Sequence, residues 1–220
     1  MFVSFEGPDG SGKTTQARLL CQALEARGWD VVQTREPGGT AIGEQIRHIL
    51  HNVANESMTP KTEVLLYSAA RAQHVEEIIL PALERGAIVI SDRYAESTLA
   101  YQGYGHGLEL PMLKCITDFC TRKVYPDLVI YLDLAAAEGL GRKRRDQREG
   151  RGEWNRMDQQ ALAFHRRVRE GYLEMARQDG DRWLILDATQ SVEALYEKVL
   201  GHIEGLLPRN DSADTTTFEA

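Results

Sequence analysis

The sequence has 220 residues, of which 42% are hydrophobic and 27% are charged, which is the composition of an ordinary soluble globular protein. It excludes collagen-like, mucin-like and wholly disordered chains. Lys and Arg number 26 against 33 Asp and Glu, so the formal net charge is −7. A net-acidic chain disfavours binding to duplex DNA, because neutralising the phosphates of DNA needs a basic surface. We therefore expect no nucleic-acid partner.

Cysteine usage and hydrophobicity indicate the cell interior. Cys21, Cys115 and Cys120 are too few and too scattered for a disulfide framework or a Cys-based zinc site. The N-terminus lacks the basic region and the long apolar run of a signal peptide. No stretch approaches the ~20 apolar residues that a membrane-spanning helix needs. We expect a soluble, cytoplasmic protein without a membrane partner.

Short apolar runs alternate with longer helical patterns along the chain. Predicted strands lie at 2–5, 31–34, 87–90, 128–132 and 183–186. Predicted helices lie at 17–24, 42–50, 62–85, 110–120, 161–175 and 192–203, and Pro81 is expected to bend or break the third. Short strands separated by helices indicate βαβ units. The sequence predicts an α/β fold with a five-stranded parallel sheet flanked by helices on both faces.

Two segments depart from this pattern. Residues 142–158 hold seven basic and four acidic residues with two glycines, which predicts a mobile charged loop. Residues 208–220 are mostly polar and show no period, which predicts a disordered tail. The remainder, residues 1–207, is expected to form a single domain.

A phosphate-binding motif follows the first predicted strand. Residues 7–14 fit G-x-x-x-x-G-K-[ST] at every position and open a predicted helix. In that context, backbone amides curl around phosphate oxygens at the helix N-terminus, Lys13 reaches the β- and γ-phosphates, and the Thr14 hydroxyl ligates Mg²⁺. The alternative, a glycine-rich turn that only caps a helix, does not explain why Lys13 and Thr14 follow the glycines. The candidate nucleotide-binding residues are Gly7, Pro8, Asp9, Gly10, Ser11, Gly12, Lys13 and Thr14.

This motif is shared by small-molecule kinases, ATPase motors and GTPase switches. A GTPase needs N-K-x-D to read guanine, and the nearest string, at 155–158, lacks the lysine. A motor usually has a catalytic acid beside its metal-binding aspartate, whereas Asp92 is followed by Arg93. These comparisons favour a kinase.

The third predicted strand ends in Asp92, which is typical of an aspartate that holds Mg²⁺ through water. An aspartate that caps the next helix is the alternative. Arg93 follows directly, at the place where the phosphates of a donor and an acceptor would meet. A surface ion pair is the alternative for that residue.

The string Asp92-Arg93-Tyr94, followed by Ser-Thr-Leu-Ala-Tyr-Gln-Gly at 97–103, resembles the signature segment of the thymidylate kinases. The resemblance covers roughly residues 1–207 in order, through further strings at 35–40, 67–74, 125–128, 155–159 and 187–190. It implies the three-layer fold of a P-loop kinase, ATP as phosphoryl donor with Mg²⁺, dTMP as acceptor, and a homodimer.

The resemblance also implies roles at the acceptor base. Tyr67 is expected to lie against the thymine ring, and Arg71 to donate to a thymine carbonyl. Thr98 and Gln102 are expected to hydrogen-bond the base edge. Without the resemblance, Tyr67 and Arg71 would be interpreted as one buried ring and one surface cation on a helix.

Further roles concern the sugar and phosphate of the acceptor. Tyr101 resembles the residue that disfavours a ribose 2′-hydroxyl, and Asp9 resembles the acid that accepts from the 3′-hydroxyl. Arg93 and Arg47 would hold the 5′-phosphate. Residues bordering this pocket in relatives, with no chemistry assigned, are Glu36 and Pro37.

The charged segment 142–158 resembles the lid of a nucleotide kinase, although solvated surface is the usual role of a charge run. Because the phosphate loop contains no arginine, the chain resembles the bacterial thymidylate kinases whose lid supplies the catalytic one. Arg156 and Arg151 are the candidates. The loop with Ala188 and Thr189 resembles the one beside the ATP adenine.

The reaction so implied transfers the ATP γ-phosphoryl group to dTMP, giving dTDP and ADP. Two alternatives stay open: a related nucleoside or nucleoside-monophosphate kinase with another acceptor, and a nucleotide-binding regulatory protein without turnover. The intact set of Lys13, Thr14, Asp92 and Arg93 argues against the second.

Overall fold

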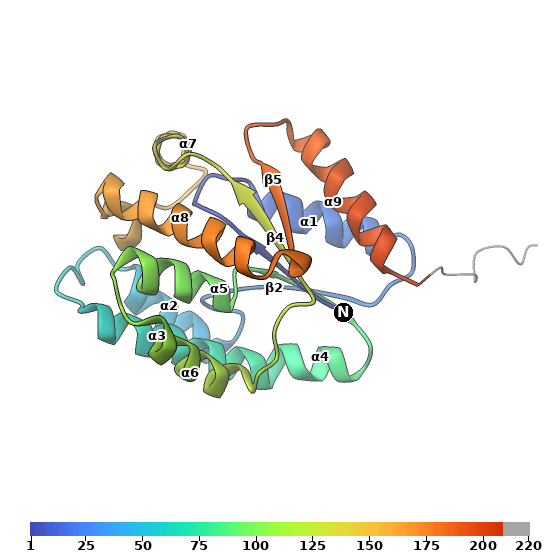
Figure 1. Ribbon diagram of the computed structural model, residues 1–220, viewed down its shortest axis with the longest axis horizontal. Coiled ribbons are helices and arrows are strands. Elements are labelled where there is room, and N and C mark those ends of the chain that lie inside the picture. Colours follow the sequence, from blue (N-terminus) through green and yellow to red (C-terminus); the bar gives the residue numbers. More distant parts are fainter. Residues whose placement is uncertain (209–220) are drawn as a thin grey trace, which may run out of the picture.

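The computed structural model describes residues 1–208. One parallel sheet with strand order β2-β3-β1-β4-β5 forms its centre (Figure 1). The strands are β1 (Phe2–Glu6), β2 (Val31–Arg35), β3 (Ile88–Asp92), β4 (Leu128–Asp133) and β5 (Trp183–Asp187). Helices cover both faces, so the predicted fold class is confirmed. The predicted tail lies outside the described residues except for Pro208.

The helices surround this sheet, and several begin at the residues that favour a helix start. Thr40, Thr59 and Ser191 each accept a backbone N–H of the first turn through the side-chain oxygen. The α-helices are α1 (Lys13–Glu25), α2 (Ala41–His51), α3 (Pro60–His74), α4 (Leu80–Glu84), α5 (Ala95–Thr98), α6 (Leu110–Thr121), α7 (Ala136–Arg148), α8 (Leu162–Gln178) and α9 (Val192–Leu206). Wider or tighter turns form η1 (Val75–Ile79), η2 (Leu99–Gly105), η3 (Arg156–Gln159) and η4 (Gly180–Arg182).

The central strands are buried on both faces, which explains their continuous apolar runs. Val3 and Phe5 of β1 belong to a core cluster with residues of α1 and α9, whereas Phe2 packs on the opposite face with η1 and α4. A third cluster joins Val129 and Tyr131 of β4 to η2 and α8. Successive residues of each strand therefore point to opposite faces of the sheet, and each face packs against its own layer of helices.

Two sequence expectations differ from the structure. The helix predicted at 62–85 begins at Pro60 and continues through η1 into α4, because Leu80 N–H bonds to the Val75 carbonyl five residues earlier and so accommodates Pro81. The segment predicted as a charged loop at 142–158 is helical to Arg148. No helix among residues 1–208 is long and apolar enough to cross a membrane.

Candidate active site

The phosphate loop joins β1 to α1 at the carboxyl edge of the sheet. Gly7, Gly10 and Gly12 adopt positive φ angles of 142°, 79° and 94°. A Cβ at Gly7 would come within 2.6 Å of the Leu132 carbonyl oxygen, so the loop needs glycine there for space as well as for conformation. The Lys13 ammonium donates to the Pro8 carbonyl at 2.9 Å, which folds its side chain back over the loop.

Burial lowers the pKa of Lys13 to about 8, and the nearby Arg93 adds to this effect. Asp9 opposes it, because its carboxylate favours the charged ammonium. A cation that is only 6% exposed, at the start of a helix, is suited to bind an anion that enters the loop.

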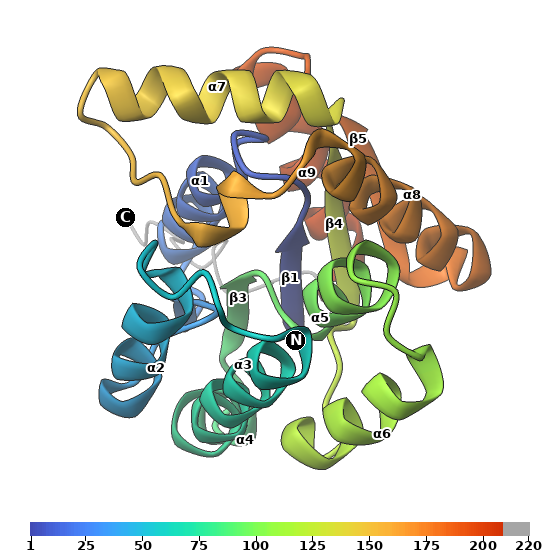
Figure 2. The same cartoon turned by 90° about the vertical axis from the view of Figure 1, so that its left-hand side faces the viewer.

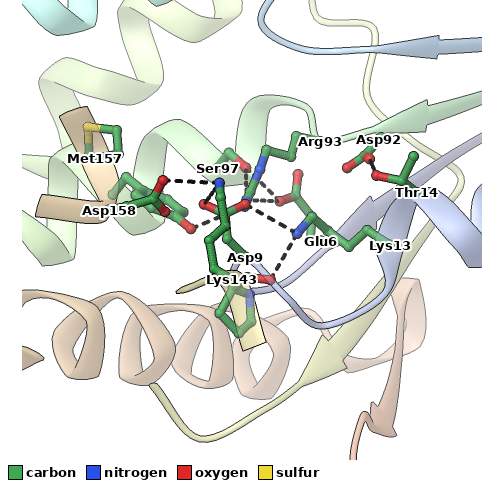
Figure 3. Close-up of polar contacts among 12 residues, drawn as sticks. Glu6, Asp9, Lys13, Thr14, Asp92, Arg93, Ser97, Lys143, Met157 and Asp158 are labelled. Atoms are coloured by element: carbon green, nitrogen blue, oxygen red, sulfur yellow. Dashed lines mark hydrogen bonds and ion pairs between the residues drawn. The ribbon is translucent and has the colours of Figure 1, made fainter. Parts of the chain in front are cut away.

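Thr14 and Asp92 lie together because β1 and β3 are neighbours in the sheet. The Thr14 hydroxyl donates to the Asp92 carboxylate at 2.5 Å (Figure 3). The hydroxyl and the carboxylate thus present hard oxygen donors side by side at the end of the phosphate loop. This donor set fits Mg²⁺, which takes one or two protein oxygens together with water and substrate phosphates.

Arg93 follows β3 in a left-handed backbone conformation, with φ of 73°. Its guanidinium donates to the Asp9 carboxylate at 2.9 Å and to the Tyr101 hydroxyl at 3.2 Å. Further bonds run to Ser97 at 3.2 Å and to Tyr172 at 3.4 Å. The structure therefore brings together the predicted residues of the phosphate loop, the strand end and the sugar pocket.

Asp9 lies among three cations. Its carboxylate is 2.9 Å from Arg93, 3.7 Å from Lys143 and 3.9 Å from Lys13. Burial would raise the pKa of the Asp9 carboxyl, but Arg93 and the two lysines outweigh it and hold that pKa well below its usual range. Lys143 also lies 3.1 Å from Asp158, which is 3% exposed. The positive charges that a triphosphate needs are thus already collected at this point (Figure 3).

Helix α7, in the segment that we predicted to form a lid, lies over this cluster. Figure 2 shows α7 crossing above the loop that joins β1 to α1, and Arg142 of α7 donates to the Gly10 and Ala188 carbonyls at 3.5 and 3.1 Å. The predicted adenine loop, with Ala188 and Thr189, therefore lies beside the phosphate loop.

Neither predicted lid arginine contacts Asp9 or Lys13. Arg156 is 4% exposed, donates to the Leu50 carbonyl at 3.0 Å and pairs with Glu63. Arg151 is exposed and pairs with Asp146 at 2.9 Å. The cation of α7 that contacts Asp9 is Lys143.

Two of the predicted base-binding residues, Arg71 of α3 and Thr98 of α5, contact each other. Arg71 is 2% exposed and donates to Glu36 at 2.8 Å, to Thr98 at 2.8 Å and to the Tyr94 carbonyl at 3.0 Å. His74 lies 3.0 Å from the other Glu36 oxygen. Burial would raise the pKa of Glu36, but Arg71 and His74 lower it overall. Glu36, which we expected only to border the pocket, therefore fixes the Arg71 guanidinium.

The other predicted pocket residues contact different groups. Gln102 donates to Glu63 at 2.6 Å, so its amide is held from the α3 side. Burial and the neighbouring Glu63 raise the pKa of Tyr67, which keeps that hydroxyl neutral. Arg47 of α2 donates to the Pro37 carbonyl at 3.0 Å and so packs against the loop after β2.

Comparison with known proteins identifies the family. A family model described as thymidylate kinase matches residues 5–199. The chain belongs to the thymidylate kinase family. The thymidylate kinase of Roseiflexus sp. (strain RS-1) is 52% identical over 214 residues, which are 94% of this chain and 95% of that protein. The one of Bacillus pumilus (strain SAFR-032) is 45% identical over 210 residues, 96% of this chain and 98% of that protein.

A solved structure supports the same conclusion. The crystal structure of thymidylate kinase from Ehrlichia chaffeensis matches with a TM-score of 0.73 at 32% identity, covering 92% of this chain and 98% of that chain. The resemblance read from the sequence motifs is thus confirmed for the thymidylate kinase family.

Sequence reasoning missed three residues of this thymidylate kinase site. Glu6 lies beside Arg93, His74 holds Glu36, and Lys143 holds Asp9. Glu6 stands directly before the phosphate loop, and this position is the sequence signal for its place in the site. Lys143 lies four residues after Gly139, which packs on the phosphate loop. This spacing places the two on one face only if 136–148 is helical, and the sequence did not predict that helix.

Proposed function

We propose that this chain transfers the γ-phosphoryl group of ATP to the 5′-phosphate of dTMP, giving dTDP and ADP in dTTP biosynthesis. The observation that carries the proposal is the position of Arg93. Its guanidinium reaches Asp9 of the phosphate loop and Tyr101 of the sugar pocket at once. A cation between a nucleotide loop and an acceptor pocket fits phosphoryl transfer between two nucleotides.

The chemistry needs positioning more than proton transfer. A phosphate monoester has a second pKa of about 6, so an acceptor oxygen is already unprotonated near neutral pH and needs no general base. This oxygen attacks the γ-phosphorus while the bond to the β–γ bridging oxygen breaks, and ADP leaves. Lys13, Arg93 and a lid cation neutralise charge on the moving group. The closed lid excludes water that would otherwise accept it.

Mg²⁺ would accompany ATP in this proposal, and Thr14 and Asp92 would hold it. When bound, the metal neutralises charge on the β- and γ-phosphates. The Thr14–Asp92 contact supports this assignment, since it brings the two oxygens within 2.5 Å of each other. Asp92→Asn should raise the Mg²⁺ concentration needed for half-maximal rate, and EDTA should abolish turnover.

The acceptor pocket lies between α3, η2 and the loop after β2. Tyr67 covers the base, and Arg71, Thr98 and Gln102 bind its edge. Tyr101 excludes a 2′-hydroxyl. Arg93 and Arg47 hold the 5′-phosphate, and Asp9 accepts from the 3′-hydroxyl. Glu36 and Pro37 border the pocket.

Lys143 acts as the lid cation in the arrangement described here. Arg151 and Arg156 are engaged by carboxylates, so either would have to exchange its partner before it reached a phosphate. Ala188 and Thr189 border the adenine.

The chain forms a homodimer through α3 and α6. Leu65 of α3 and Phe119 of α6 are 61% and 84% exposed, and both line one apolar surface between these helices. Sedimentation of the wild type should give twice the monomer mass, and Phe119→Glu should give monomers. The free thiols of Cys21, Cys115 and Cys120 support a cytoplasmic location.

A second candidate is a related kinase with another pyrimidine acceptor, because Arg71 already donates to three protein oxygens. The deciding experiment measures ADP production with Mg-ATP against dTMP, dUMP, UMP, dCMP, CMP and thymidine. Preference for dTMP supports the proposal. Another preferred acceptor keeps the kinase and rejects the base assignments. If no acceptor increases ADP production, both the dTMP kinase and the kinase with another acceptor are rejected.

A further inference from the structure

Glu6 is a buried carboxylate to which the mechanism above gives no role. It ends β1, directly before Gly7, and its side chain is fully buried. Oε1 accepts the Tyr94 N–H at 2.7 Å. Oε2 accepts the Ser97 and Tyr172 hydroxyls, each at 2.7 Å. Three donors, two from the start of α5 and one from α8, therefore converge on one carboxylate; Figure 3 labels Glu6 and Ser97.

The partners of Glu6 are also those of Arg93. Ser97 and Tyr172 accept from Arg93 Nη1 at 3.2 and 3.4 Å, and that nitrogen lies 4.0 Å from Glu6 Oε2. The Tyr94 N–H bound by Oε1 belongs to the peptide directly after the left-handed Arg93. A non-glycine residue keeps such a backbone conformation only when its surroundings hold it. Glu6 therefore fixes the Arg93 guanidinium, through Ser97 and Tyr172, and also the backbone directly after Arg93.

We propose that Glu6 is a positioning residue for phosphoryl transfer, and that in its ionised form it aims the Arg93 guanidinium at the transferring phosphates. The inference rests on the proposed dTMP kinase activity. A carboxylate can accept from all its donors at once, whereas a protonated carboxyl must donate one proton and loses its attraction for Arg93.

The electrostatics place this change near neutral pH. Burial raises the pKa of Glu6 to about 7, even though Arg93 opposes the shift. The charged and titratable groups that act on or are acted on by Glu6 are Lys13 of α1, Arg93 after β3, Glu96 of α5, Tyr101 of η2 and Tyr172 of α8. Because the pKa is raised, Glu6 is neutral below this pH and ionised above it, so Arg93 is best positioned on the alkaline side.

The test compares Glu6→Gln with the wild type as a ratio of kcat/KM for dTMP over a range of pH. The ratio cancels the titration of dTMP itself, and kcat/KM reports the free enzyme. At about pH 6 the wild-type carboxyl is mostly protonated and resembles the amide, so the ratio should be within about threefold of one. At about pH 8.5 the variant should be about tenfold or more slower. A ratio that does not change with pH would overturn the proposal.

Two variants separate positioning from loss of packing. Glu96→Gln removes another buried carboxylate, which pairs with Arg182 at 2.9 Å and not with Arg93. Because Glu96 raises the Glu6 pKa, this variant should be at least as active as the wild type at about pH 6 and should match it at about pH 8.5. Tyr172→Phe removes a donor that lowers the Glu6 pKa, so its loss of activity should be largest near neutral pH. If Glu6→Gln does not fold, Tyr172→Phe carries the test, and a loss independent of pH would count against Glu6.

A signal that needs no turnover distinguishes failure of this inference from failure of the proposed function. The ¹⁵Nε resonance of Arg93 in the wild type should shift with pH, with a midpoint near the Glu6 pKa of about 7. Glu96→Gln should move this titration to lower pH and Tyr172→Phe should move it to higher pH. A resonance that does not titrate overturns the inference, whichever acceptor the enzyme uses.

Discussion

The Glu36 carboxylate lies 2.8 Å from Arg71 Nε, and both side chains are almost fully buried. Removing one partner of a buried ion pair leaves a charge without compensation, which costs about 3–5 kcal/mol. We therefore expect Glu36→Gln to lower the free energy of unfolding by about 3–5 kcal/mol in urea denaturation. The KM for dTMP should rise as well, because Arg71 loses the group that fixes its orientation.

The matched control is the exposed pair of Arg27 and Glu204, 2.6 Å apart. Glu204→Gln should change the free energy of unfolding by less than about 1 kcal/mol, since solvent screens both charges. Similar losses for the two variants would contradict the role given to burial at Glu36.

Arg93→Ala should separate turnover from nucleotide binding. The guanidinium acts on charge that develops during transfer, so kcat should fall about 10²-fold or more, while the KM for ATP changes only about threefold. Steady-state kinetics with both substrates varied measures the two effects. Arg169→Ala, which breaks the partly exposed pair with Asp133 at 2.7 Å, should keep wild-type turnover. Equal losses in kcat and ATP affinity would reject the bridging role.

The strands could be predicted from the sequence because each is a short apolar run that is buried on both faces where it is central. Val3 and Ile90 face α1 and α9, and their neighbours Phe2 and Val89 face the opposite layer. Helix α7 could not be predicted in the same way. Only Ala136 and Gly139 among its residues are buried, so no apolar period marks a helix.

The site could be predicted where its residues follow a strand in a contiguous motif. The phosphate loop and Arg93 meet because the carboxyl ends of parallel strands share one edge of the sheet. His74 and Lys143 act across the fold instead, on Glu36 and Asp9. Their partners lie far along the chain, so local patterns carry no signal for these contacts.

Tyr101 should determine the choice of sugar. Its ring is 8% exposed and lies 5.1 Å from the Arg93 guanidinium, beside the proposed site of the acceptor. Tyr101→Ala should reduce the preference for dUMP over UMP by about tenfold, because the ring no longer fills the space of a 2′-hydroxyl. Tyr101→Phe keeps the ring and should keep the preference. Loss of preference in both variants would assign the effect to the hydroxyl bond with Arg93.

Lys13 should give an alkaline limit to ATP use. Its pKa is lowered to about 8 by burial and Arg93, so the ammonium loses its proton as pH rises through that value. We expect kcat/KM for Mg-ATP to fall above about pH 8, while kcat persists to higher pH because bound phosphates raise the pKa again. Lys13→Arg should remove this limit, since a guanidinium stays charged. A limit that survives in Lys13→Arg would belong to another group.

Lys143 should be the cation that the lid contributes to catalysis. Its ammonium lies 3.1 Å from Asp158 and 3.7 Å from Asp9, so closure of α7 places a positive charge beside the phosphate loop. Lys143→Met should lower kcat by about tenfold or more with a smaller change in the KM for ATP, and Lys143→Arg should restore most of the rate. Arg148→Ala, at an exposed position of α7, is the control. If Lys143→Met keeps its turnover while Arg151→Ala or Arg156→Ala loses it, the lid must rearrange on substrate binding to bring an arginine forward.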